Sequence, residues 1–245
     1  MTVAVLANQF HVILRNRPDV VARWDDTEVA RRWLSNHEDQ ATGRFFEERY
    51  RATRLLDEAS VLACSAYVDL NPIRAALCET IESSDHTSAK LRIESMRQEN
   101  SADRLAASSP GEPIEPIRKR PDAMLSPVSI DERTDPIGPC IAATGDRCSE
   151  KGYLSMSVLD YVELLDWTAR QSRSAPSGRT PRDMPPLLKR LGLSASAWCE
   201  LVGRFGRLFH HVAGCPESID RLRGHRRGGR FRVNRRVREL MPARE

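Results

Sequence analysis

Apolar and polar residues alternate near the start of the chain in the pattern of a β-hairpin. Thr2–Leu6 is a short and mostly apolar run, and the two residues after it, Ala7-Asn8, are suited to a turn. The next segment, Gln9–Arg15, alternates with a period of two, which places on one face Gln9, His11 and Ile13 and on the other Phe10, Val12 and Leu14. We therefore expect two paired strands.

A short helix and a further strand are predicted next. Asp25–Leu34 has helical periodicity, and an aspartate at position 25 or 26 is placed to cap its first turn. Gly43–Thr53 is typical of a strand, with Phe46 as its anchor in the core.

The segment Leu56–Asn71 predicts a longer helix with one mostly apolar stripe. Acidic residues at positions 57 and 58 suit its positive N-terminal end. Pro72 ends this helix, because the residue before a proline is pushed out of the α region. Strands that alternate with helices indicate a small α+β domain over residues 1–92.

Two regions of different composition follow. Residues 97–150 hold seven of the 15 prolines together with many Ser, Asp and Glu residues, which predicts a disordered linker. Residues 153–240 return to helical periodicity, with helices expected at Ser157–Gln171, from Pro185 to Gly192 and at Ser196–Val212. The last two have the pattern of a helix-turn-helix, and an ordinary helical hairpin gives the same pattern.

Composition limits the class of protein. Of the 245 residues, 40% are hydrophobic and 29% are charged, and no apolar run approaches the ~20 residues that span a bilayer. The N-terminus lacks the basic leader and cleavage site of a signal peptide, so we expect a cytoplasmic protein with no membrane partner. The six cysteines form no CxxC pair and lack histidines at zinc spacing, which favours free thiols over a structural zinc site.

Positive charge is concentrated at the C-terminal end. The formal net charge is +4, but residues 203–245 contain 12 arginines and only four acidic residues. A basic tail on a near-neutral body favours a polyanionic partner, and nucleic acid is the first candidate. A solvated tail that keeps the protein soluble explains the same charge, so charge alone leaves both alternatives open.

Three segments, taken in order, resemble a known family. They are Asn8-Gln9-Phe10-His11-Val12-Ile13-Leu14, then Gly43-Arg44-Phe45-Phe46-Glu47, then Ala66-Tyr67-Val68-Asp69-Leu70-Asn71-Pro72-Ile73-Arg74-Ala75. This order is similar to the HUH-type single-tyrosine transposases, in particular the REP-associated tyrosine transposases, which show N-H-x-H, then G-R-F-W, then Y-x-x-x-N-P-x-R-A. The resemblance covers about residues 1–90 and is most specific in the tyrosine segment.

The resemblance implies a fold and an activity. The fold is an α+β domain of the HUH endonuclease or ferredoxin-like type, with a partial antiparallel sheet and helices on one face. The activity is DNA transposition, in which Tyr67 attacks a phosphodiester of single-stranded DNA, often beside a hairpin, keeps the 5′-phosphate and releases a 3′-OH. A divalent cation, Mg²⁺ or Mn²⁺, polarises the phosphate, and its implied ligands are Gln9, His11 and Asn71. Both monomers and homodimers occur in the family.

Spacing is consistent with these implied roles. Positions 9 and 11 share one face of a strand, and positions 67 and 71 are one turn apart on a helix, with Cβ atoms roughly 5–6 Å apart. A tyrosine hydroxyl has a reference pKa near 10 and needs activation, which a nearby cation supplies. The candidate contacts to DNA phosphate are Arg74, Arg226, Arg227, Arg230, Arg232, Arg235 and Arg236.

Each site residue also has an ordinary structural explanation. A tyrosine on an amphipathic helix is commonly a core residue whose hydroxyl is hydrogen-bonded. Asn71 is suited to cap the helix before Pro72, and Arg74 to solvate the end of that helix. A single histidine in a strand, such as His11, is commonly a half-buried residue without a ligand role.

Two departures from the family bear on the expected activity. Gln9 stands where the family has the first histidine of its strand pair, and an amide oxygen is a neutral and weaker ligand. Family members have a strand and a helix before this strand, so we expect a truncated copy. Three hypotheses follow: an active transposase or nickase, a transposase-derived DNA-binding protein that no longer cleaves, and a helical interaction module centred on residues 153–240.

Overall fold

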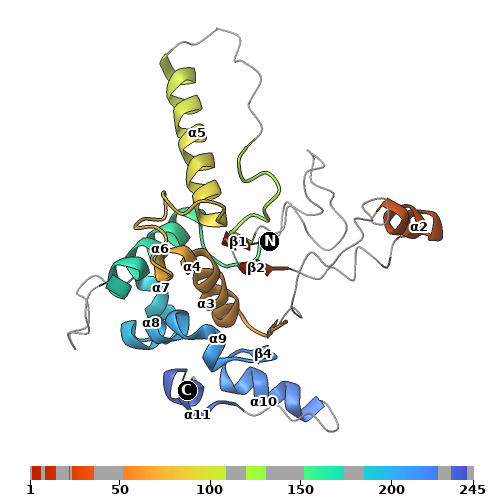
Figure 1. Ribbon diagram of the computed structural model, residues 1–245, viewed down its shortest axis with the longest axis vertical. Coiled ribbons are helices and arrows are strands. Elements are labelled where there is room, and N and C mark those ends of the chain that lie inside the picture. Colours follow the sequence, from red (N-terminus) through yellow and green to blue (C-terminus); the bar gives the residue numbers. More distant parts are fainter. Residues whose placement is uncertain are drawn as a thin grey trace.

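The computed structural model describes residues 2–6, 9–14, 22, 24–35, 52–108, 120–130, 152–173, 185–225 and 233–241. In these ranges the chain is a mixed α+β protein in which helices predominate (Figure 1). The predicted α+β class is confirmed at this level. Among the described helices, none combines the length and the apolar composition needed to cross a lipid bilayer.

The N-terminal hairpin forms as predicted. Strand β1 (Thr2–Leu6) pairs antiparallel with β2 (Gln9–Ile13). The expected alternation also holds, because His11 and Ile13 are half-buried whereas Val12 is exposed. The face that carries His11 is therefore turned toward the protein.

A second pair of strands joins segments that are far apart in the sequence. Strand β3 (Arg54–Leu55) lies parallel to β4 (Val212–Ala213). The backbone N–H of Arg54 donates to the carbonyl of His211 at 2.8 Å. A single antiparallel sheet was expected, and this expectation is wrong for β3 and β4: two-residue strands carry too little pattern to be recognised, and they meet only because the helices around them pack.

The wider antiparallel sheet of the HUH type is not present among the described strands, which form two separate pairs. The predicted strand Gly43–Thr53, with its anchor Phe46, lies outside the described residues except for its last two. Ala52 and Thr53 are not in a strand. The short helix predicted nearby is present as α2 (Asp26–Ser35).

Helix α3 (Glu58–Asp69) begins with a capping box. The carboxylate of Asp57 accepts a hydrogen bond from the backbone N–H of Ser60 at 2.9 Å. In return, the Ser60 hydroxyl accepts one from the backbone N–H of Asp57 at 3.2 Å. Two N–H groups that the helix itself cannot pair are thereby satisfied, which fixes where α3 starts.

The end of this helix differs from the prediction. A single helix up to Asn71 was expected, but α3 stops at Asp69, and a separate turn, α4 (Asn71–Arg74), begins after Leu70. Pro72 is accommodated because it stands in the first turn of α4, where its missing N–H is not needed. The break keeps Tyr67 and Arg74 close while changing the direction of the chain between them.

Part of the predicted linker is ordered. Helix α5 (Ser88–Ser108) continues well past residue 97, and residues 120–130 return to the core through Leu125 and Val128. The hydroxyl of Ser95 donates to buried Asp122 at 2.7 Å and fastens this return to α5. The linker prediction is therefore wrong for the ordered parts, because a few buried side chains and one polar anchor hold a proline-rich segment that has no periodicity of its own.

The rest of that segment, residues 109–119 and 131–150, lies outside the described residues. So do Cys140 and Cys148, while the other four cysteines are free thiols. The free state of these four cysteines agrees with the prediction made from the spacing of the cysteines in the sequence.

Helices fill the C-terminal region, as expected. They are α6 (Val158–Arg173), α7 (Pro186–Arg190), α8 (Ala195–Gly203), α9 (Phe205–Leu208), α10 (Pro216–His225) and α11 (Arg235–Leu240). Gly192 follows α7 with φ of 69°, a left-handed conformation that favours glycine. The long helix expected at Ser196–Val212 is broken at Arg204 and ends at Leu208.

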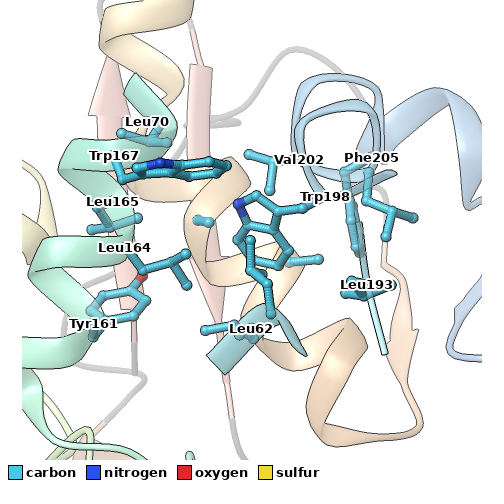
Figure 2. Close-up of a cluster of buried hydrophobic side chains, with 14 of the residues drawn as sticks. Leu62, Leu70, Tyr161, Leu164, Leu165, Trp167, Leu193, Trp198, Val202 and Phe205 are labelled. Carbon is cyan, nitrogen blue, oxygen red and sulfur yellow. The ribbon is translucent and has the colours of Figure 1, made fainter. Parts of the chain in front are cut away.

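One hydrophobic cluster includes side chains from both the N-terminal and the C-terminal regions. Figure 2 shows its centre, where residues of α3, α6 and α8 meet. Trp198 is fully buried and donates its indole N–H to the Thr168 hydroxyl at 2.9 Å. The regions that composition separates therefore share one core, and α3 lies against both α8 and the hairpin (Figure 1).

Candidate functional site

Tyr67 stands in the last turn of α3 and is half-buried. Its ring contacts His11 from β2, Arg74 from α4 and Phe205 from α9. The first two come from the segments that resemble the transposase motifs. Asn71 joins the group through Arg74, so four predicted site residues lie in one place.

His11 meets the tyrosine edge to face. The ring centroids of His11 and Tyr67 are 5.8 Å apart and the ring planes are inclined at 87°. This T-shaped geometry brings the positive edge of one ring to the negative face of the other. The hairpin makes the contact possible, because β2 lies against α3 and its period of two turns His11 inward.

Arg74 covers the face of the same ring. Its guanidinium carbon is 3.9 Å from the centroid of Tyr67, within the range of a cation–π contact. One terminal nitrogen donates to the backbone carbonyl of Val202 and the other to Oδ1 of Asn71, each at 2.9 Å. The predicted alternative, an arginine that only solvates the helix end, does not describe this side chain.

The positive charge of Arg74 has only neutral partners among the described residues. It bonds a carbonyl and an amide and covers a phenol, and no carboxylate of the described residues forms an ion pair with it. Burial lowers the pKa of Arg74, and the Tyr67 phenol offsets part of that effect. A partly desolvated guanidinium with neutral partners is suited to bind an anion.

Burial and the charge of Arg74 also determine the protonation state of His11. Burial lowers the pKa of His11, and the nearby charge of Arg74 lowers it further. Since the usual value is about 6.5, the imidazole is neutral at pH 7. A neutral imidazole keeps one nitrogen able to accept a proton or a hydrogen bond.

Asn71 is almost fully enclosed, with 7% of its surface exposed. Its amide oxygen accepts the bond from Arg74, while its amide nitrogen is buried without a partner in the described part of the molecule. An unpaired buried donor costs free energy, on the order of 1–3 kcal/mol. Asn71 is therefore more than a helix cap, since its side chain holds the guanidinium of Arg74.

The divalent cation that the resemblance implies stays a prediction. Gln9 is in β2, but its side chain lies outside the described residues. Of the other implied ligands, Asn71 Oδ1 accepts a hydrogen bond from Arg74. Burial and, to a smaller extent, Arg74 lower the pKa of His11, which favours the neutral imidazole that metals bind. The described residues contain no cluster of three or more His, Cys, Asp or Glu side chains able to hold a metal. The implied ligand set of Gln9, His11 and Asn71 is of another kind, because two of its three members are amides.

Helices α8 and α9 supply a wall of the site that the sequence did not reveal. The carbonyl of Val202 fixes Arg74, and the ring of Phe205 lies 5.7 Å from that of Tyr67. Gly206 is beside the tyrosine hydroxyl. The apolar spacing of Trp198, Val202 and Phe205 indicates a buried helix face, but spacing alone cannot say which element this face covers.

A second group missed by the sequence interpretation lies two residues after Tyr67. Asp69 is fully buried and accepts hydrogen bonds from the Tyr161 hydroxyl at 2.7 Å and the Ala89 N–H at 3.2 Å. Burial raises its pKa to about 6, against the opposing effects of these bonds and of Arg92. This network joins α3 to α5 and α6 and holds the end of α3 in place.

The arginines predicted to contact DNA from the C-terminal tail divide into two sets. Arg226, Arg227, Arg230 and Arg232 lie outside the described residues. Arg235 pairs with Glu239 at 3.2 Å, and Arg236 pairs with both Glu200 and Glu239. The last two charges are thus matched by carboxylates, and Arg236 fastens α11 to α8.

The chain was compared with protein-family models, with curated proteins and with solved structures, and none of them matches.

Proposed function

We propose that this chain is a transposase-derived protein that acts on single-stranded DNA, with Tyr67 as its nucleophile. One observation carries the proposal: His11 from one transposase-like segment and Arg74 from another both contact the ring of Tyr67, and Asn71 accepts a hydrogen bond from Arg74.

The proposed step is a transesterification. The Tyr67 oxygen forms a bond to phosphorus, the bond from phosphorus to the 3′ oxygen breaks, and the 5′-phosphate stays on the tyrosine. The phenol loses its proton and the leaving 3′ oxygen gains one. His11 lies beside the ring and is neutral at pH 7, because burial and Arg74 lower its pKa, so it is the candidate proton acceptor.

Arg74 is the proposed phosphate-binding group. Its guanidinium is held by Val202 and Asn71, and it has N–H donors beyond the two that these bonds use. A fixed cation next to the phenol neutralises the charge that develops on the phosphate during attack. The implied cation would be held by Gln9, His11 and Asn71, and the side chain of Gln9 lies outside the described residues, so no step is assigned to a metal.

The test is a covalent adduct assay on the full chain. The protein is incubated with single-stranded oligonucleotides, with and without a hairpin, in the presence of Mg²⁺, Mn²⁺ or EDTA. A denaturing gel then detects DNA that stays bound, and mass spectrometry locates the phosphotyrosine. We expect an adduct at Tyr67 that Tyr67→Phe abolishes, while Tyr153→Phe, a change in another half-buried tyrosine, preserves it. An adduct that persists in Tyr67→Phe contradicts the nucleophile assignment.

A second candidate is a transposase-derived protein that binds DNA without cleaving it. Two observations favour it: the Asn71 oxygen is occupied by Arg74, and Gln9 replaces a family histidine. It predicts salt-sensitive binding of single-stranded DNA with no adduct under any metal condition. Gel shifts at rising salt, run on the same samples, separate the two candidates, and sedimentation of the complex distinguishes a monomer from a homodimer.

A further inference from the structure

We propose that Gly206 is the access point to the Tyr67 hydroxyl, through which a DNA phosphodiester reaches the phenol. The turn from Val202 to Gly206 is then part of the tyrosine site, although it belongs to the C-terminal region. This inference rests on the proposed function, because it names the route by which the substrate of that function arrives.

Gly206 lies so that any side chain at this position would point toward the Tyr67 hydroxyl. A Cβ atom built there is 3.4 Å from the Tyr67 oxygen and 3.9 Å from the carbon that bears it. Apart from neighbours in its own helix and chain, no third heavy atom of the described residues lies within 4 Å of that position. A larger side chain at this point would therefore lie against the hydroxyl.

Neither backbone conformation nor packing requires glycine here. Gly206 does not adopt the left-handed conformation that Gly192 has. A Cβ at Gly214, in contrast, would lie 2.8 Å from a carboxylate oxygen of Asp57, so packing requires glycine at that position. Glycine inside a helix costs up to ~1 kcal/mol relative to alanine, and what it preserves in α9 is the space at the hydroxyl.

The surroundings of this space suit an anionic phosphodiester. Arg74 lies over the tyrosine ring and has no carboxylate partner among the described residues. Phe205 is 4% exposed and fills the wall behind, so it is unavailable for base stacking. The surroundings of Gly206 thus combine a phenol oxygen with a fixed cation, the pair that attack on a phosphodiester requires.

The experiment measures access to the hydroxyl with and without DNA. N-acetylimidazole transfers its acetyl group to accessible phenol oxygens, and peptide mass spectrometry measures the rate at Tyr67. The variants are Gly206→Ala and Gly206→Leu, matched by Gly203→Ala and Gly203→Leu, where a Cβ meets nothing within 4 Å. The fully buried Tyr161 serves as the unreactive internal reference.

We expect acetylation of Tyr67 to fall in the order wild type, Gly206→Ala, Gly206→Leu, with roughly a tenfold loss in the leucine variant. The Gly203 variants keep the wild-type rate, and formation of the DNA adduct follows the same order. Melting temperatures identify the folded variants, and the alanine variant, which fits without displacing any atom, decides the outcome if the leucine variant fails to fold.

Unchanged acetylation in the folded Gly206 variants overturns the access role of this residue. An equal loss in the Gly203 variants also overturns it, because the effect would then not be specific to position 206. If acetylation follows the expected order but the wild type forms no DNA adduct, the access role stands and the proposed nucleophilic function fails.

Discussion

The hairpin and α3–α4 differ from the C-terminal helices in whether their sequences contain recognisable motifs. The first region carries the chemical groups of the site, His11, Tyr67, Asn71 and Arg74, in short motifs. The second carries no motif, yet its Val202 and Phe205 hold two of those groups in place. The motifs of the candidate site thus lie in one region. The side chains and backbone that hold the site together come partly from another region, whose sequence shows only a buried helical face.

The largest expected effect tests whether the two regions fold as one unit. Leu165 on α6 is 0% exposed, whereas Leu159 on the same helix is 52% exposed. Leu165→Ala should lower the free energy of unfolding by about 2–5 kcal/mol, since it leaves a cavity in the shared core. Leu159→Ala should change it by roughly 0.5 kcal/mol or less.

Urea unfolding, followed by tryptophan fluorescence and by acetylation of Tyr67, measures both variants. Coincident transitions are expected in Leu165→Ala. If the urea midpoint measured by Tyr67 acetylation stays at the wild-type value while the midpoint measured by fluorescence falls, the two regions unfold independently.

The next effect concerns the polar link between the regions. The pKa of Asp69 is raised to about 6, above its unfolded value near 3.8, so the folded state binds the extra proton between these values. Stability supported by the protonated form is therefore complete below pH 4 and is lost as pH rises through 6, by roughly 3 kcal/mol.

Asp69→Asn should remove this slope, because an amide does not titrate in that range. The measurement is urea unfolding of both proteins between pH 4 and pH 7.5, with the difference between them isolating Asp69 from other carboxyl groups. A difference that is constant across this range would contradict the burial of Asp69 against Tyr161 and Ala89.

A smaller effect tests the contact between the hairpin and α4. Arg74 lowers the pKa of His11, in addition to the effect of burial. Arg74→Met should therefore raise the pKa of His11 toward its usual value, which NMR titration of the imidazole measures. Arg74→Lys keeps the charge and should leave the pKa of His11 lowered. If the methionine variant titrates like the wild type, β2 and α4 do not meet at Tyr67.

The smallest effect concerns the surface pairs of α11. Arg236 joins α11 to Glu200 of α8, while Arg235 pairs only within α11. Arg236→Ala should lower the melting temperature slightly at low salt, and Arg235→Ala should lower it less. Both differences should vanish in 1 M salt, where exposed pairs are screened. Equal melting temperatures at low salt would show that α11 is held by Val237 and Leu240 alone.

Local patterns in the sequence were sufficient to predict the hairpin and the approximate start of α3, whereas the resemblance pointed to His11, Tyr67, Asn71 and Arg74. Period-two alternation orients His11. The helical spacing expected between Tyr67 and Asn71 is wrong, because α3 stops at Asp69 and Asn71 begins α4. The ordered parts of residues 97–130 could not be predicted, because Leu125 and Val128 are two isolated apolar residues in a proline-rich stretch. The parallel pair of β3 and β4 was missed for the same reason, since two residues have no period.

The sequence by itself determined which residues form the hairpin and α3, and which chemical groups those elements carry. Only the tertiary structure decided that Arg74 turns back over Tyr67 and that α9 brings Gly206 to its hydroxyl. Secondary structure depends on neighbours within a few residues, and it is visible in the sequence as a periodic pattern of apolar positions. Contacts across more than a hundred residues depend on how buried faces fit together, and a helical stripe does not encode its partner.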